Sequence, residues 1–398
     1  MQEKKVTGLN TFAILSLSLV AMTITVVTPA IGTFAGVFAA HGTAFTFIST
    51  LPTLFIVIGT FLAGAIMGKT VKYRTLAIVG NTIALIGGCL PALICTPDNF
   101  PVLLVCRAFF GFGMGLMSPL GNALIIGHFQ GQKQASLMGY GTLFMNAGGI
   151  VCQMLGGALA GIDWKLTFWG HGFLIIAVIM SFFIPEPPKM EAPAPEEGVA
   201  VDGPKPGLGK VTVIAAIVLA LFNIVNYPNM MNISTLFIQR NAGGAVAAAT
   251  ALSLYTVAGC VAGLIFGQIF KFASRICMFL GFALCAVGGC AIYFGTTGLL
   301  MTAGLCLMGF GFSLVMPSLM IWLGMATHPT KIASATAIVM ACMNLGAFVS
   351  SFYVNIIQGI FGENYITGGL IISIVVFVAL AVIFLVASPF KKPAAPQE

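Results

Sequence analysis

One charged side chain, Arg107, lies inside an apolar segment of the sequence, six residues after Pro101. At about 1.5 Å per residue, this spacing places Arg107 roughly 9 Å along a helix that begins near the proline. A guanidinium suits two-point recognition of a carboxylate, and an arginine within a bilayer costs at least about 2.5 kcal/mol unless a partner or a wet cavity receives it. Arg107 therefore indicates either a binding site for an anionic group or a structural arginine bonded to backbone carbonyls near the outer surface.

Three polar side chains, Asn223, Asn226 and Tyr227, follow one another at spacings i, i+3 and i+4, so they share one face of a helix. A polar stripe in lipid is costly. We therefore expect this stripe either to face a cavity and bind substrate, or to form hydrogen bonds between helices.

Asn146 and Asn344 occur at matching places in the two halves of the chain. Both are candidate binding residues, and the alternative is that each amide bonds the backbone at a bend of a shared scaffold. Phe110, Met114 and Tyr255 are candidates for the apolar lining of a pocket. Packing within the core is the alternative for each of these three.

The elements that position these side chains must lie in lipid. Of the 398 residues, 17 are Lys or Arg and 10 are Asp or Glu, so 7% are charged, and 59% are apolar. Soluble domains carry about 25% charged residues, and a mean hydropathy of +1.06 leaves too little polar surface to cover a water-soluble globule. The ten cysteines lie in apolar stretches without a CxxC pair, so we expect packing residues, with no metal site and no cofactor. The predicted fold class is an all-α polytopic membrane protein.

Apolar runs predict twelve transmembrane helices in two six-helix bundles. The first six lie near residues 9–30, 44–67, 76–95, 101–126, 136–160 and 167–184, and the second six near 211–238, 245–267, 276–294, 299–326, 334–359 and 367–388. Between them, residues 185–210 hold seven of the 19 prolines and five of the 10 acids, a composition that cannot bury a core. We therefore expect an N-terminal bundle at 1–184, a cytoplasmic proline-rich linker at 185–210, and a C-terminal bundle with a short tail at 211–398.

The basic residues predict the orientation in the membrane. With the N-terminus inside, 14 of the 17 Lys and Arg residues fall on the cytoplasmic side, and only Lys165 and Arg240 fall outside, which leaves Arg107 within a helix. This asymmetry follows the positive-inside rule. We expect a multi-pass protein of the cell membrane with both termini in the cytoplasm and no role in binding nucleic acid.

The two halves repeat each other at an offset of about 199 residues. Residues 64–73 correspond to 263–272, a Gly-Gly-Cys triplet ends at both Cys89 and Cys290, and residues 111–119 correspond to 309–317. So many matches in one register indicate a duplication. Because six is an even number, both halves enter the membrane in the same sense, as pseudo-symmetric bundles.

The loop after the second predicted helix resembles a motif of the major facilitator superfamily. Gly64, Lys69 and Lys72 match places in that family's Gly-x-x-x-Asp-Arg-x-Gly-Arg-Lys motif. Gly68 stands where the motif has its acid, and Val71 where it has its second glycine. The family's charge contact between this loop and a helix is therefore not expected here.

Other segments support the same resemblance. Arg107-x-x-x-Gly111 is similar to the family's helix-four motif, Trp164 with the lysine after it to its Trp-Arg segment, and residues 185–186 to its exit from helix six. The Gly-Pro pair of the antiporter signature has no equivalent in the fifth predicted helix. The absence of this pair argues against a proton-drug exporter.

The resemblance implies a transporter in which two bundles rock against each other, with a substrate site between them near the bilayer midplane. The residues assigned to this conformational change are glycines, basic residues and prolines at the ends and bends of helices: Gly64, Gly68, Lys69, Lys72, Arg74, Pro119 and Pro317. The alternative is static packing of small residues and the ordinary frequency of proline in membrane helices.

The scarcity of titratable groups in the spans bears on the substrate. All ten acids fall in the tails, the linker or the outer loops, and the four histidines fall at loop or helix edges, where we expect them to be solvated. Since proton-coupled carriers use a titratable side chain in the pathway, we expect a facilitator or exchanger of a small organic anion such as a carboxylate, or a symporter whose substrate carries the proton. The alternative is a proton-coupled multidrug or metabolite exporter of the same superfamily.

An enzyme is not expected, because the spans contain no HExxH, no GxSxG and no pair of carboxylates. We expect a monomer whose partners are the bilayer and a small-molecule substrate, with a co-transported proton in the case of a symporter.

Overall fold

The computed structural model describes residues 7–68, 70–129, 131–187, 209–327 and 332–387. The chain divides into two compact units, Met1–Lys205 and Pro206–Glu398. Most of the predicted linker, residues 188–208, lies outside the described residues. In the described part, the β structure amounts to one isolated bridge between Met67 and Val71, and the rest of the regular structure is helical.

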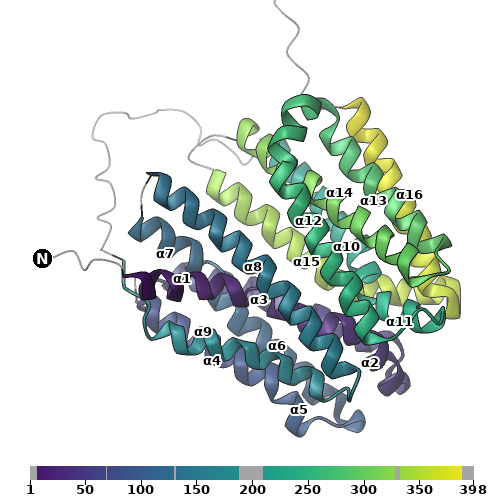
Figure 1. Ribbon diagram of the computed structural model, residues 1–398, viewed down its shortest axis with the longest axis horizontal. Helices are drawn as coiled ribbons and strands as arrows, with labels where there is room; N and C mark the ends of the chain where they lie inside the picture. Colours follow the sequence, from purple (N-terminus) through teal and green to yellow (C-terminus); the bar gives the residue numbers. More distant parts are fainter. Residues whose placement is uncertain (1–6, 69, 130, 188–208, 328–331, 388–398) are drawn as a thin grey trace, which may run out of the picture. The chain divides into compact units, whose positions relative to one another are not determined.

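The first unit is drawn from purple to teal in Figure 1. Its α-helices and 3-10 helices (η) are α1 (Gly8–Val20), η1 (Thr23–Ala30), α2 (Ile31–Val37), η2 (Ala39–Thr46), α3 (Phe47–Ile66), α4 (Tyr73–Cys89), α5 (Pro91–Ile94), η3 (Pro97–Asn99), α6 (Phe100–Met117), α7 (Leu120–His128), α8 (Gly131–Ala160), η4 (Leu166–Leu174) and α9 (Ile175–Ser181).

The second unit is drawn from green to yellow in Figure 1. Its elements are α10 (Gly209–Met231), α11 (Ile233–Gln239), α12 (Ala245–Ala273), η5 (Ser274–Ile276), α13 (Cys277–Phe294), α14 (Gly298–Ala326), α15 (Ile332–Phe361), η7 (Gly362–Asn364) and α16 (Tyr365–Val386).

The helices of the described residues are long and apolar enough to cross a bilayer. Nine stretches qualify as candidate spans, and two of them, Ala245–Phe294 and Ala335–Val386, are 50 and 52 residues long and each hold two helices. A shorter apolar helix covers Leu166–Ser181. The protein is therefore an all-α polytopic membrane protein, and its described helices are consistent with twelve crossings.

Several predicted helices are interrupted in the structure. The predicted fourth helix divides at Pro119, which precedes α7, because proline lacks the amide hydrogen that would continue α6. Its counterpart, Pro317, lies inside an unbroken α14. The predicted seventh helix divides at Asn232, between α10 and α11.

Both units use the same pairs of neighbouring helices. In the first unit, α6 packs against α3 and α4, the first helix packs against α8, and α4 packs against η4 and α9. In the second unit, α14 packs against α12 and α13, α10 packs against α15, and α13 packs against α16. The contacts thus confirm the duplication that the sequence indicates.

Close approach of α3 and α6 depends on glycine. A Cβ at Gly111 would meet the backbone of Pro52, and a Cβ at Gly115 would meet the backbone of Ile56 and lie 2.9 Å from the Cα of Gly59. Backbone cannot move aside as a flexible side chain can, so these positions exclude larger residues. The spacing Gly111-x-x-x-Gly115 here serves helix packing.

The exit of the sixth helix is held by the start of α4. The carboxylate of Glu186 accepts hydrogen bonds from the amides of Tyr73, at 3.0 Å, and Arg74, at 2.9 Å. These amides belong to the first turn of α4 and have no partner within the helix, and a negative charge there is favourable. Arg74 returns the contact through its Nε, which donates to the carbonyl of Ile184 at 2.9 Å.

Two further helices bind the same exit. The amide nitrogen of Asn10, on α1, donates to the carbonyl of Phe183 at 2.7 Å. The Nε2 atom of His128, on α7, lies 3.2 Å from the carbonyl of Pro185. Four helices of the first unit therefore meet where the chain leaves it.

Arg240 holds the end of α13 in the second unit. Its guanidinium donates to the carbonyls of Ile292 and Gly295, both at 2.5 Å, and of Tyr293 at 2.9 Å. The last carbonyls of a helix lack partners within it, and a cation complements them. Burial lowers the pKa of Arg240 from its usual value, and its contacts give this arginine a structural role.

Candidate functional site

Arg107 lies on α6 with an exposed fraction of 0%. Its Nε donates to the carbonyl oxygen of Ile48 at 2.7 Å, and its guanidinium carbon lies 4.4 Å from the ring centroid of Phe110. A cation over an aromatic face is stabilised by the ring quadrupole. The contact with a backbone carbonyl is the one that the structural interpretation of Arg107 predicts.

The carbonyl of Ile48 needs a donor because of Pro52. In an α-helix this carbonyl would accept a hydrogen bond from the amide four residues later, and the residue at that place inside α3 is Pro52, which has no amide hydrogen. The Nε–H of Arg107 takes the place of the missing donor. One contact thus satisfies a buried backbone acceptor and places a cation in the span Pro97–Ile125.

His171, on η4, completes the cluster. Its Nε2 lies 3.0 Å from Nη1 of Arg107, and its Nδ1 lies 3.0 Å from the carbonyl of Phe168. A carbonyl only accepts, so Nδ1 carries the proton and Nε2 accepts from the guanidinium. The ring also meets Phe110 edge to face, with centroids 4.7 Å apart.

The expectation that the four histidines are solvated is wrong for His171, whose exposed fraction is 0%. The sequence places it only five residues after Leu166, where the apolar helix begins. A 3-10 turn directs the ring inward at that point. His41 is exposed and stacks on Phe100, and His328 lies outside the described residues.

In the second unit the predicted polar stripe on α10 reaches α12. Asn226 is buried and forms a hydrogen bond with the hydroxyl of Tyr255, so the structure brings together two of the candidate residues. Asn223 is half-buried, and its amide donates to the carbonyl of Leu219 at 3.1 Å. Tyr227 is also half-buried. The stripe includes contacts between helices and contacts within α10.

The polar stripe continues along α10 beyond the three residues that the sequence predicts. Asn229 donates to Ser373 on α16 at 3.0 Å, and Asn232 follows three residues later. A period of three falls short of a 3.6-residue turn, so successive asparagines point about 60° apart around the helix. This recurrence of asparagine at every third position was the signal that could have identified Asn229 and Asn232.

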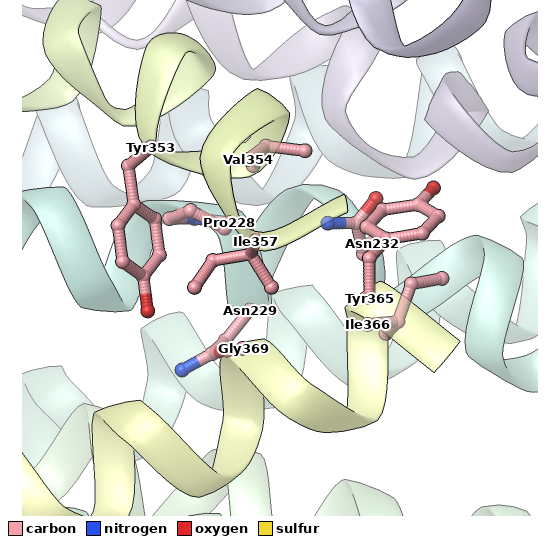
Figure 2. A pocket seen from close by; sticks show the side chains of 9 residues that line it. All are labelled: Pro228, Asn229, Asn232, Tyr353, Val354, Ile357, Tyr365, Ile366 and Gly369. Carbon is pink, nitrogen blue, oxygen red and sulfur yellow. The ribbon is translucent and has the colours of Figure 1, made fainter. Parts of the chain in front are cut away.

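Figure 2 shows the cavity at this break in the seventh helix, lined by Pro228, Asn229, Asn232, Tyr353, Val354, Ile357, Tyr365, Ile366 and Gly369. About 10 Å³ is open to the centre of a water molecule, which fits one water and is far below the ~300 Å³ of a pocket for a drug-sized ligand. The side-chain oxygens of Asn232 and Tyr353 are buried there without a hydrogen-bond partner among the described residues. Its size suits a bound water rather than a substrate.

The remaining candidate binding residues have mixed surroundings. Phe110 and Met114 are buried in the core of the first unit, as the packing alternative predicts. The amide of Asn344 donates to the carbonyl of Met340, four residues before it, at 3.0 Å, which fits a scaffold role. Asn146 is half-buried on α8.

Five of the seven residues assigned to conformational change lie in or beside the segment between α3 and α4 in the sequence, and the other two are Pro119 and Pro317. Gly68 has a φ of 71°, in the left-handed region that favours glycine, and Lys72 precedes the first turn of α4. A Cβ at Gly64 would meet no described atom within 4 Å. Lys69 lies outside the described residues, while Arg74 forms the contact with Ile184 given above.

All ten cysteines are free thiols. Among the described residues, no group of three or more His, Cys, Asp or Glu side chains is placed to hold a metal ion.

Comparisons with known proteins agree with this architecture. The family model described as Major Facilitator Superfamily matches residues 13–271 and 215–398. No curated protein sequence matches the chain closely enough to indicate a relationship.

Solved transporter structures share the fold at low sequence identity. A D-xylose-proton symporter aligns with a TM-score of 0.78 and 16% identity, over 96% of this chain and 98% of its own. A bacterial homolog of the human lysosomal transporter Spinster aligns with a TM-score of 0.75 and 15% identity over 100% of both chains. The nucleoside transporter NupG aligns with a TM-score of 0.72 and 16% identity, over 97% of this chain and 100% of its own. With the family match over nearly the whole sequence, these findings show that the chain belongs to the major facilitator superfamily and is a membrane transporter of small molecules rather than an enzyme.

Proposed function

We propose that this transporter carries a small organic anion, with a carboxylate as the recognised group, by alternating access of its two bundles. The observation that carries the proposal is the sign of the buried charge. Arg107 is fully buried, whereas the described acidic side chains, Asp98, Asp163, Glu186 and Glu363, are all exposed. In a medium of low dielectric constant, a buried cation attracts an anion and repels a cation.

The candidate binding residues divide between the charged group and the uncharged part of the substrate. Arg107 would bind the carboxylate, and the polar groups Asn146, Asn223, Asn226, Tyr227, Tyr255 and Asn344 would bind the uncharged part of the substrate together with Phe110 and Met114. The residues in and beside the loop between α3 and α4, Gly64, Gly68, Lys69, Lys72 and Arg74, would act in conformational change together with Pro119 and Pro317. The 14 basic residues that fall on one side of the membrane support a cell-membrane protein with both termini in the cytoplasm. We expect this protein to act as a monomer.

A matched ligand series tests the sign of the substrate. Benzoate, benzamide and benzylamine have nearly the same shape and differ in charge, as do succinate and its diamide. Purified protein in detergent is heated with each compound, because a ligand that binds only the folded state raises the melting temperature by mass action. We expect the acids to stabilise the protein and the amides and amines to have no effect.

Proteoliposomes then test transport itself. Uptake of the best stabilising acid should be saturable and should fall at least about tenfold in Arg107→Lys, since an ammonium cannot provide the two-point contact of a guanidinium. Stabilisation by amines, or extrusion of cationic dyes with no transport of acids, contradicts the proposal and favours the multidrug exporter.

A further inference from the structure

The anion-binding role proposed above leaves one buried titratable side chain unexplained. His171 has no exposed surface, and ionisable side chains are rare in helices that lie in lipid. The homologous contact in the second unit is apolar, because the second glycine of the triplet there, Gly289, faces Ile374. The corresponding glycine of the first unit, Gly88, faces His171. At this contact, a histidine is therefore present in the first unit and replaced by an isoleucine in the second.

The groups that face His171 come from two neighbouring helices and from η4 itself. From α6 come the guanidinium of Arg107, at 3.0 Å, and the ring of Phe110. From α4 comes Gly88, and from η4 itself comes the carbonyl of Phe168. The thiol of Cys106, next to Arg107 in sequence, is hydrogen-bonded to Cys95. The described carboxylates all lie at exposed positions.

The hydrogen bonds define the charge of the imidazole in this state. With Nδ1 donating to Phe168 and Nε2 accepting from Arg107, both ring nitrogens are engaged and the ring is neutral. A proton on Nε2 would remove the acceptor that Arg107 uses and would place a second positive charge beside the first. His171 can therefore be protonated only if the guanidinium leaves it.

We propose that His171 is a proton-binding site coupled to the substrate through Arg107, so that the transporter carries a carboxylate and a proton together. The inference rests on the proposed function, because a carboxylate is what draws the guanidinium away from Nε2. The freed Nε2 lone pair then takes a proton from the aqueous side to which the site is open. On the other side the anion and the proton leave together, and Arg107 returns to His171.

The cluster has the same net charge with and without the bound anion and proton, and this supports the coupling. In the state described here, the cluster holds one positive charge, on Arg107. With a monovalent anion bound and His171 protonated, two positive charges and one negative charge again sum to one. The net charge buried in the bilayer does not change between the two states, which avoids the several kcal/mol that an additional unpaired buried ion would cost.

The variant His171→Gln separates proton binding from the hydrogen bond. Glutamine can still accept from Arg107 through its carbonyl and donate through its amide, but it cannot be protonated. In proteoliposomes, one unit of inward proton gradient should drive about tenfold accumulation of the transported carboxylate by the wild type, since one pH unit is equivalent to about 1.4 kcal/mol. His171→Gln should exchange labelled for unlabelled carboxylate at equal pH and should show no accumulation above equilibrium.

The control is His128→Gln, which removes an imidazole that lies against the carbonyl of Pro185 and should accumulate carboxylate as the wild type does. Gradient-driven accumulation by His171→Gln overturns the inference. A folded His171→Gln protein that loses exchange as well also overturns it, because the histidine is then only a structural clamp.

Two further arms keep the test decisive. If His171→Gln does not fold, wild-type protein labelled with 15N-histidine is titrated with the transported carboxylate, and one imidazole should change from neutral to doubly protonated. If every imidazole keeps its protonation state, the inference is overturned. If the wild type transports no carboxylate, the proposed function has failed, and the same gradient test is applied to whichever solute raises the melting temperature, with the same two outcomes for His171.

Discussion

Gly88 leaves the space that His171 occupies. A Cβ at Gly88 would lie 2.6 Å from the Cβ and 2.7 Å from the Cγ of His171, distances that real Cβ contacts do not reach. These atoms are near the backbone of η4, so the histidine cannot avoid them by rotating its ring. The absence of a side chain on α4 is therefore as necessary to the cluster as the imidazole is.

Gly88→Ala should destabilise the first unit and move His171 away from Arg107. Overpacking of this kind costs about 1–3 kcal/mol, and we expect a lower melting temperature in detergent together with weaker accumulation driven by a proton gradient. Gly64→Ala is the matched control for the melting temperature alone, because a Cβ there meets no described atom within 4 Å. Equal melting temperatures for the two variants would contradict the packing argument.

Pro52 and Arg107 should be coupled in a double-mutant cycle. Arg107→Gln in the natural sequence leaves the carbonyl of Ile48 without its donor, whereas in Pro52→Ala a backbone amide can take over. The cost of Arg107→Gln should therefore be smaller in the Pro52→Ala background, by about 1 kcal/mol. Chemical unfolding of the four proteins in mixed micelles measures this difference, and an equal cost in both backgrounds would show that the two residues act independently.

Glu186→Gln should weaken the junction at the exit of the sixth helix. The variant keeps the shape of the side chain but loses the charge that faces the start of α4, for an expected cost of about 1 kcal/mol. Protease cleavage near residue 186 should become faster, and the melting temperature should fall by a few degrees. Glu398→Gln removes the same charge from the end of the chain, outside the described residues, and unchanged cleavage is expected there.

A lysine at position 240 should not restore the stability that Arg240 provides. A lysine keeps the positive charge at the end of α13 but cannot reach the carbonyls of Ile292, Tyr293 and Gly295 with a fixed planar group. We expect Arg240→Lys to recover less than half of the stability lost in Arg240→Ala, which is of the order of 2 kcal/mol for several charge-assisted hydrogen bonds. Full recovery by lysine, measured as the melting temperature, would mean that the charge alone matters.

The sequence was sufficient for the helical class, the family and the duplication, because lipid enforces long apolar runs and the repeated glycines mark close contacts. Gly111 and Gly115 illustrate this, since two glycines four residues apart on α6 let the backbone of α3 approach closely. It was less informative about helix continuity. Pro119 and Pro317 correspond in the repeat, yet one marks a helix break and the other lies in an unbroken helix, so the outcome depends on local packing.

The Arg107 cluster could be predicted only in part. The sequence identified the arginine, and it contained the sign of an unpaired carbonyl in Pro52, but it could not show which distant donor reaches that carbonyl. His171 is 64 residues from Arg107 in the chain and lies next to a loop in sequence. Its inward direction follows from the 3-10 turn and from the space at Gly88, both of which are features of the folded unit.

The second unit has an uncharged counterpart of the Arg107 cluster, at the positions that correspond to it in the repeat. Leu305, at the place of Arg107 in the repeat, is fully buried. With the 199-residue offset that relates residues 64–73 to 263–272, Ala251 stands where the first half has Pro52. Where the arginine is absent, the proline that deprives a carbonyl of its donor is absent too. The same scaffold thus folds once around a cation and once around hydrocarbon within a single chain, which identifies the charge as an addition to a frame that does not require it.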